Sequence, residues 1–176
     1  MKRMLSLVAL ALVVGAGTAS AQGATVKGAL GFHSSDTPLG VRWWLSDKVA
    51  LDAGLGFGST EFGGESFSNS AFDIGLPVML KSWDRVNFMV RPGIFYASQE
   101  VPLVPGPGTG DDTSLAIVGE LEAEVFLADN FSVSAAHGLA IINNDPAQGS
   151  STSDWTTFGS NFTNVGFHVY LFGGSK

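Results

Sequence analysis

The chain has 176 residues, of which 45% are hydrophobic and only 14% are charged. Its length suits a single domain, and so large an apolar fraction excludes an intrinsically disordered chain. The 23 glycines follow no Gly-x-y period, which excludes collagen, and the absence of cysteine excludes disulfides, thiolate metal sites and thiol nucleophiles. The formal net charge of −7 argues against a nucleic-acid partner, because nucleic-acid-binding proteins normally present a basic face.

Residues 1–21 have the pattern of a cleavable secretory signal peptide. Lys2 and Arg3 form a basic start, an apolar stretch follows, and a small-x-small cleavage pattern ends at Ala21. The apolar stretch is shorter than the about 20 residues that a membrane-spanning helix needs. We therefore predict an exported protein whose mature chain, residues 22–176, forms one domain.

After residue 21, apolar residues recur at every second position, which is the period of a β-strand. In segment 49–57 the odd positions are Val, Leu, Ala, Leu and Phe, whereas the even positions are Ala, Asp, Gly and Gly. No segment of the mature chain predicts a helix. The alternation predicts eight strands, at residues 26–33, 39–45, 49–57, 72–80, 86–96, 115–127, 131–141 and 165–172.

Two kinds of connection alternate between the predicted strands. One kind is a tight turn, at residues 46–48, 82–85 and 128–130. The other kind is rich in Gly, Pro, Ser, Asn and Asp, which interrupt strands; its members are residues 34–38, 58–69, 98–113 and 143–154. Aromatic residues are expected in two girdles: Trp43, Trp44, Trp83, Phe126, Phe131 and Tyr170 near the tight turns, and Phe57, Phe72, Tyr96 and Trp155 near the long loops.

An apolar face on every strand needs a covering layer, and the chain has no further segment that supplies one. A barrel whose outer face contacts lipid meets this need, and its closure also removes unpaired strand edges. Transmembrane barrels have short periplasmic turns, longer extracellular loops and aromatic girdles at both interfaces. We therefore predict an all-β fold, an eight-stranded antiparallel up-and-down transmembrane β-barrel at residues 22–176.

Taken together, the signal peptide, the alternating strands and the turn pattern resemble the small OmpA/OmpX-type outer-membrane barrel proteins of Gram-negative bacteria. The sequence NVGFHVYL matches the last-strand pattern of this family through Asn164, Gly166, Val169 and Leu171. The family usually ends on an aromatic residue, whereas here Phe172 is followed by Gly-Gly-Ser-Lys. The resemblance implies that the four residues form an assembly signal for the barrel assembly machinery. It also implies that the protein resides in the cell outer membrane, in contact with lipid and lipopolysaccharide.

If the apolar face of each strand contacts lipid, the alternate face points into the barrel. Counting from the tight turn pairs Arg42 with Asp52, and counting from the long loop places Arg91 near Glu120. Buried charges are costly unless they are paired, and eight strands leave room only for side chains. We therefore predict a lumen filled by an interior polar network, with glycines at small inward positions that make room for it. Its charged members are Lys27, Arg42, Asp52, Asp73, Arg91, Glu120, Glu122 and Glu124.

The long-loop end is uniformly acidic. Its four connections contain no Lys or Arg, and their acidic residues are Asp36, Glu61, Glu65, Glu100, Asp111, Asp112, Asp145 and Asp154. We expect solvated acidic loops on the outside of the cell. Divalent cations are candidate partners at these loops, although the adjacent Asp111 and Asp112 lack the ligand spacing of a defined metal site.

Nothing in the sequence predicts catalysis. Some eight-stranded outer-membrane barrels are lipid A deacylases or palmitoyl transferases, and a hydrolase needs a nucleophile next to a base. His33 precedes Ser34, but neighbouring strand residues point to opposite faces. His137 lacks the His-x-Ser-Asn pattern of the deacylases. Strict alternation places His137 on the lipid side, so we expect a bulge or a shifted register at this position. His168 falls inside. We expect no enzyme activity, no metal site and no cofactor.

The resulting prediction is an integral outer-membrane protein with a structural or surface-interaction role, which presents acidic extracellular loops. One alternative is a narrow cation-preferring channel, because five interior acids outnumber three interior bases. Another alternative is a secreted lipocalin-like binder of an apolar ligand, in which the apolar faces would point inward and the charged faces outward. The aromatic residues at strand ends and the last-strand pattern favour the membrane barrel.

Overall fold

The computed structural model describes residues 26–32, 36–104, 108–157 and 163–173. All regular secondary structure in these segments is β-strand, and the strands form one antiparallel sheet. No helix of the described part is long and apolar enough to cross a membrane. The strands are β1 (Val26–Phe32), β2 (Leu39–Trp44), β3 (Ala50–Phe62), β4 (Glu65–Gly75), β5 (Val78–Ser82), β6 (Val86–Pro102), β7 (Thr109–Ala128), β8 (Phe131–Asp145), β9 (Thr152–Thr156) and β10 (Thr163–Gly173).

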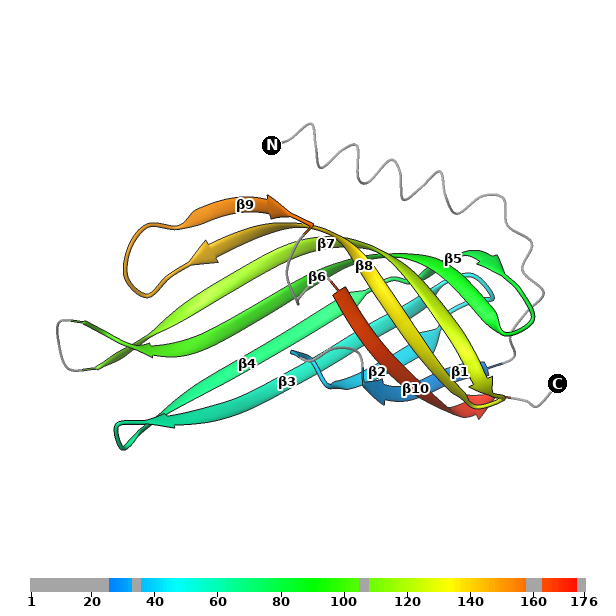
Figure 1. Ribbon diagram of the computed structural model, residues 1–176, viewed down its shortest axis with the longest axis horizontal. Helices are drawn as coiled ribbons and strands as arrows, with labels where there is room; N and C mark the ends of the chain where they lie inside the picture. Colours follow the sequence, from blue (N-terminus) through cyan, green and yellow to red (C-terminus); the bar gives the residue numbers. More distant parts are fainter. Residues whose placement is uncertain (1–25, 33–35, 105–107, 158–162, 174–176) are drawn as a thin grey trace.

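The sheet closes into a ring, because β1 pairs with β2 on one side and with β10 on the other. The ring continues through β3, β4, β6, β7 and β8 and returns to β10 (Figure 1). Two places in the ring are each shared by two strands: β4 and β5 both pair with β6, and β9 and β10 both pair with β8. The described residues therefore form an eight-position, up-and-down, antiparallel barrel, which confirms the predicted all-β barrel architecture.

A break in the predicted strand 72–80 separates β4 from β5. It falls at Leu76 and Pro77, and proline has no N–H to donate to a neighbouring strand. The backbone N–H of Leu76 donates to the carbonyl of Pro92 at 2.9 Å, which keeps the broken strand attached to β6. The ring therefore stays closed across the break.

Of the three segments that we predicted as long loops, 58–69 and 98–113 are largely strand and 143–154 is strand at both of its ends, so this part of the prediction was wrong. β3 and β4 stay paired up to a two-residue turn at Gly63 and Gly64, whose positive φ angles of 64° and 85° are those that a type I′ hairpin turn requires. β6 and β7 stay paired up to Pro102 and Thr109, and β8 continues into a hairpin with β9. These hairpins project beyond the barrel at the end opposite the tight turns (Figure 1).

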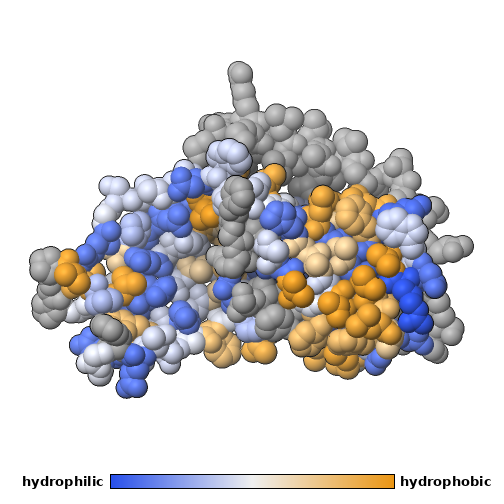
Figure 2. Space-filling view, in the orientation of Figure 1, coloured by the Kyte–Doolittle hydropathy of each residue, from blue (hydrophilic) through white to orange (hydrophobic). Residues whose placement is uncertain are grey.

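The outer surface of the barrel is apolar over the part nearest the tight turns. We call this surface the apolar belt; each of its eight ring positions contributes exposed apolar side chains, for example Leu30, Val41, Leu51, Ile74, Ile94, Ile117, Leu139 and Leu171. Figure 2 shows apolar side chains gathered toward one end of the long axis, whereas hydrophilic side chains dominate the projecting hairpins. The alternating apolar face of each strand therefore points outward, as predicted.

Next to the tight turns, the interior holds an apolar cluster. Trp44, Met79, Met89 and Tyr170 are its large members, each 6% exposed or less, and Phe126 packs against them. The prediction that Trp44, Phe126 and Tyr170 belong to an outer girdle was therefore wrong. Trp44 follows Trp43 directly, so the strand places the two rings on opposite faces, and Trp43 is the one exposed. The apolar cluster closes this end of the lumen.

Candidate functional site

The centre of the lumen is filled by arginine and carboxyl side chains, beginning with a pair at its wall. Arg42 on β2 and Asp52 on β3 lie directly opposite each other in the sheet. The Nε of Arg42 donates to Oδ1 of Asp52 at 2.8 Å, and its Nη2 donates to Oδ2 at 2.7 Å. Both side chains are fully buried. This two-pronged contact is the strongest common geometry between arginine and a carboxylate, and it confirms the predicted pair.

Arg42 also contacts the opposite side of the barrel. Its Nη2 donates to the two carboxylate oxygens of Glu122 on β7, at 2.8 and 2.9 Å. Its Nη1 lies 3.6 Å from Oε1 of Glu124, two residues further along β7. One guanidinium therefore joins β2 and β3 to β7 across the lumen.

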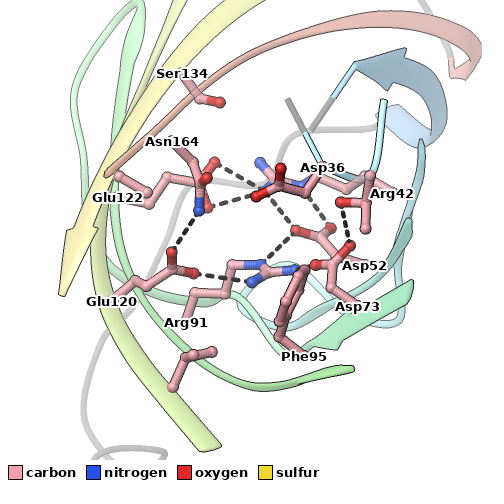
Figure 3. Close-up of a pocket in the computed structure, with 13 residues that line it drawn as sticks. Asp36, Arg42, Asp52, Asp73, Arg91, Phe95, Glu120, Glu122, Ser134 and Asn164 are labelled. Atoms are coloured by element: carbon pink, nitrogen blue, oxygen red, sulfur yellow. Dashed lines mark hydrogen bonds and ion pairs between the residues drawn. The ribbon is translucent and has the colours of Figure 1, made fainter. Parts of the chain in front are cut away.

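A second arginine, Arg91 on β6, extends the network toward the projecting hairpins. Its Nη1 donates to Oε2 of Glu120 at 2.9 Å, and the two residues are opposite each other on β6 and β7, as predicted. Its Nε donates to Oδ2 of Asp52 at 3.1 Å, and its Nη2 donates to Asp73. Asp52 therefore bonds to both arginines, and the network is continuous across the lumen (Figure 3).

Neutral side chains complete the contacts of Glu124. Its carboxylate accepts hydrogen bonds from Ser132 Oγ at 2.7 Å, Tyr170 Oη at 2.7 Å and Asn87 Nδ2 at 3.3 Å. The Nδ1 of His168 lies 3.4 Å away, so this histidine points inward as expected. Because each added donor offsets part of the cost of burying the carboxylate, these neutral residues belong to the network as much as the charged ones.

Two further contacts involve residues that sequence reasoning did not assign to the network. The Oγ1 of Thr37 donates to Asp73 at 3.0 Å, and Nδ2 of Asn164 donates to Glu120 at 2.7 Å. A single sequence does not indicate which neutral polar residues bond to the network. Asn164 was predicted only as part of the assembly signal; along β10 it and Gly166 are on the inward side, whereas Val169 and Leu171 are on the outward side.

Glycines make room for the network, as predicted. A Cβ on Gly75 would lie 2.4 Å from Cζ of Arg91, and a Cβ on Gly54 would lie 2.1 Å from Oδ1 of Asp73. A Cβ on Gly56 would lie 1.8 Å from the carbonyl oxygen of Asp36. Residues 36–38, just before β2, therefore fold into the barrel against Gly54 and Gly56.

Three features singled out by sequence lie partly or wholly outside the described residues. Lys27 lies on β1, but its side chain is outside the described residues, as are His33 and the segment 1–21. Within the described part, the network holds two arginines and five carboxylates, a formal balance of 2 − 5 = −3. The predicted balance of five acids and three bases also includes Lys27, so it stays a prediction.

His137 points outward from the barrel wall. It is opposite Leu121 on β7 and Thr163 on β10, in an unbroken register. Its Nδ1 lies 2.7 Å from Oγ1 of Thr163. The strict alternation was therefore correct, and the expected bulge at this position was wrong.

The lumen contains two cavities of different size. A cavity of about 40 Å³ lies within the network, enough for a small number of water molecules. A second cavity of about 570 Å³, which we call the vestibule, opens toward the projecting hairpins. Its polar lining includes Asp36, Asn69, Ser98, Gln99, Asp112 and Ser114.

Several acids of the projecting hairpins hold the hairpins together. Glu100 accepts hydrogen bonds from Thr109 Oγ1 at 2.6 Å and from the backbone N–H and Oγ of Ser68, both at 3.2 Å. These bonds, that from Thr109 first, lower the pKa of Glu100. Asp112 accepts a bond from the backbone N–H of Ala147 at 2.7 Å, which ties β7 to the β8–β9 hairpin. Part of the acidic surface is therefore built into strand pairing rather than displayed on loops.

The described residues contain no group of three or more His, Cys, Asp or Glu side chains that could hold a metal ion. Comparisons of the chain with protein-family models, with curated proteins and with solved structures found no match. The molecule is a closed barrel with an apolar belt outside and a charged network inside.

Proposed function

We propose that this protein is an integral outer-membrane β-barrel of the OmpA/OmpX type, with a structural or surface-interaction role. The observation that carries the proposal is the placement of the two kinds of side chain. Exposed leucine, isoleucine and valine surround the whole ring, whereas the arginines and carboxylates of the network are buried inside. So large an apolar surface is unfavourable in water, and a closed barrel is one of the two structures that satisfy every backbone group in lipid.

The extent of the apolar belt fits a bilayer. On β7 the outward apolar positions extend from Leu115 to Leu127, which covers the about 9–11 residues that a tilted strand needs to cross the hydrocarbon core. Trp43 and Trp83 are exposed near the tight turns, and Phe57 and Trp155 are exposed toward the hairpins. Such aromatic residues at both edges are typical of membrane barrels.

The proposed orientation places the acidic hairpins on the outside of the cell. Export would use the signal peptide at residues 1–21, and assembly would use the barrel assembly machinery. Lipid and lipopolysaccharide would surround the belt, and divalent cations would bridge the hairpin carboxylates to the lipopolysaccharide phosphates. In this role the protein needs no enzyme activity and no cofactor.

The structure favours a closed lumen over the alternative of a cation channel. The apolar cluster around Trp44 and Met89 fills the end nearest the tight turns, and the charged network fills the centre. A lumen blocked by two successive layers offers no continuous water path. We therefore expect planar-bilayer recordings to show no conductance above the lipid baseline, and steady single-channel steps would contradict this.

The alternative of a lipocalin-like carrier is also less well supported. A carrier of an apolar ligand needs an apolar cavity, whereas the vestibule is lined largely by hydroxyl, amide and carboxylate groups. It also needs a water-compatible outer face, whereas here the outer face is the apolar belt.

The experiment that tests the proposed function is fractionation followed by electrophoresis. Full-length protein is expressed in a Gram-negative host, membranes are washed with carbonate, and samples are run in cold SDS with and without boiling. We expect the protein in the washed membranes, with a mobility that shifts on boiling because a closed barrel resists SDS. Recovery in the soluble fraction without a shift would contradict the proposal.

A further inference from the structure

Neutral polar side chains form the rim of the vestibule. Asn69 on β4 is opposite Gln99 on β6, and Gln99 is opposite Asp112 on β7. Ala97, which is two positions along β6 from Gln99 and closer to the network, is opposite Ser114 on β7. Amide, hydroxyl and carboxylate oxygens therefore follow one another around the wall, and all of them accept hydrogen bonds.

Asp36 lies at the floor of the vestibule, together with Phe95. Both residues line the vestibule and also the small cavity within the network. The backbone of Asp36 is seated against Gly56, where no side chain larger than hydrogen fits. Among the described residues, no hydrogen bond or ion pair engages the Asp36 carboxylate. A carboxylate therefore lies at the bottom of the cavity as well as at the rim.

The formal charge of the described residues around the vestibule is negative. The network beneath it carries a formal balance of −3 in the described part, from two arginines and five carboxylates. The segments that connect the predicted strands at this end of the barrel contain Asp and Glu but no Lys or Arg. A cleft whose walls carry charge of one sign concentrates the field and raises the local concentration of the opposite ion.

The shape of the vestibule favours an elongated organic cation over a metal ion. Its volume of about 570 Å³ is in the range of small-molecule sites. The floor at Phe95 and the rim at Gln99 are four residues apart along β6, which is about 14 Å in an extended strand. The described residues hold no group of three or more His, Cys, Asp or Glu side chains that could bind a metal ion. A linear molecule with an ammonium group at each end reaches both the floor and the rim.

We propose that the vestibule binds a linear organic polyammonium ion, with one ammonium group at Asp36 and another at Asp112. The intervening N–H groups donate to the amide and hydroxyl oxygens of the wall, and the methylene groups lie against Phe95. This ligand site goes beyond the proposed envelope role, and its failure would leave the membrane barrel intact.

The test is a calorimetric titration of spermine into the folded mature barrel in detergent. We expect saturable one-to-one binding, and we expect Asp36→Asn and Asp112→Asn each to weaken it by about tenfold or more, since each removes a charged hydrogen-bond partner. Glu65→Gln is the matched control. Glu65 is exposed at the β3–β4 turn, so this substitution removes the same charge outside the vestibule. It should change the affinity by less than about twofold.

Two results would overturn the proposal. One is an equal loss of affinity in the Glu65→Gln control, and the other is displacement of spermine by Mg²⁺ at matched ionic strength, because both mean that the acidic surface attracts cations without a site. A second measurement does not depend on the folding of any variant. In the wild-type protein, spermine should shift the backbone amide signals of Ala71 and Ala97 more than those at the β3–β4 turn, and the reverse pattern would contradict the site.

Discussion

Arg42 and Asp52 face each other on adjacent strands, and the same guanidinium reaches Glu122 on the opposite wall at 2.8 Å. A single side chain therefore cross-links three strands through the middle of the barrel. Its removal leaves at least two buried carboxylates without their main partner.

For this reason we expect Arg42→Met to destabilise the barrel by about 3–5 kcal/mol, the cost of breaking a buried ion pair from one side. The measurement is urea unfolding in lipid vesicles, followed by tryptophan fluorescence. Arg85→Met is the control, since Arg85 is exposed near a tight turn, and it should shift stability by less than about 0.5 kcal/mol. Equal midpoints for Arg42→Met and the wild type would contradict a structural role for the network.

The space at Gly75 gives a second prediction. A Cβ there would collide with the guanidinium of Arg91, at 2.4 Å from Cζ, so Gly75→Ala should cost about 1–3 kcal/mol, as overpacking does. Gly119→Ala is matched to it, because a Cβ on Gly119 meets nothing within 4 Å; it should leave stability unchanged or raise it by about 0.4–1 kcal/mol. If both variants unfold at the same urea concentration, the packing of Arg91 against β4 is not as described.

The hydrogen bonds to Glu100 predict a pH effect at the projecting hairpins. They lower the pKa of Glu100 from its usual 4.5, so its stabilising contribution is complete above that value and is lost as the pH falls through the lowered pKa. A carboxyl ¹³C NMR titration of Glu100 should show the lowered pKa, and Thr109→Val should move it back toward 4.5. The control is Thr113→Val, whose hydroxyl bonds to Asp145 instead. If the pKa of Glu100 is the same in Thr109→Val as in the wild type, the hydrogen bond from Thr109 does not lower it.

A charge placed in the belt tests its contact with lipid. Leu121 is 54% exposed midway along the belt on β7, and Leu121→Arg should destabilise the barrel in vesicles by about 2–4 kcal/mol. Thr60→Arg adds the same side chain at an exposed position of the β3–β4 hairpin and should have little effect. Similar small effects at both positions would mean that the belt is not in hydrocarbon.

The alternation of apolar residues was sufficient to predict the closed barrel, its inner face and the pair between Arg42 and Asp52. A period of two fixes the face of the sheet on which each side chain lies and the register of neighbouring strands. It was not sufficient for the hairpin extensions, since segment 58–69 contains few apolar residues and both of its faces are polar. Nor did it reveal that Trp44 fills the lumen, because an aromatic residue next to a turn fits either a girdle or a plug. The contacts of Thr37 and Asn164 arise only when distant strands meet.

The central claim, that lipid covers the apolar belt, is tested most directly by spin-label accessibility in lipid vesicles. The chain contains no cysteine, so single cysteines at Leu139 in the belt and at Ser59 on the β3–β4 hairpin each give one labelled site. We expect the label at Leu139 to be accessible to oxygen and shielded from a water-soluble nickel chelate, and the label at Ser59 to show the reverse. Free access of the nickel chelate to the label at Leu139 would contradict it.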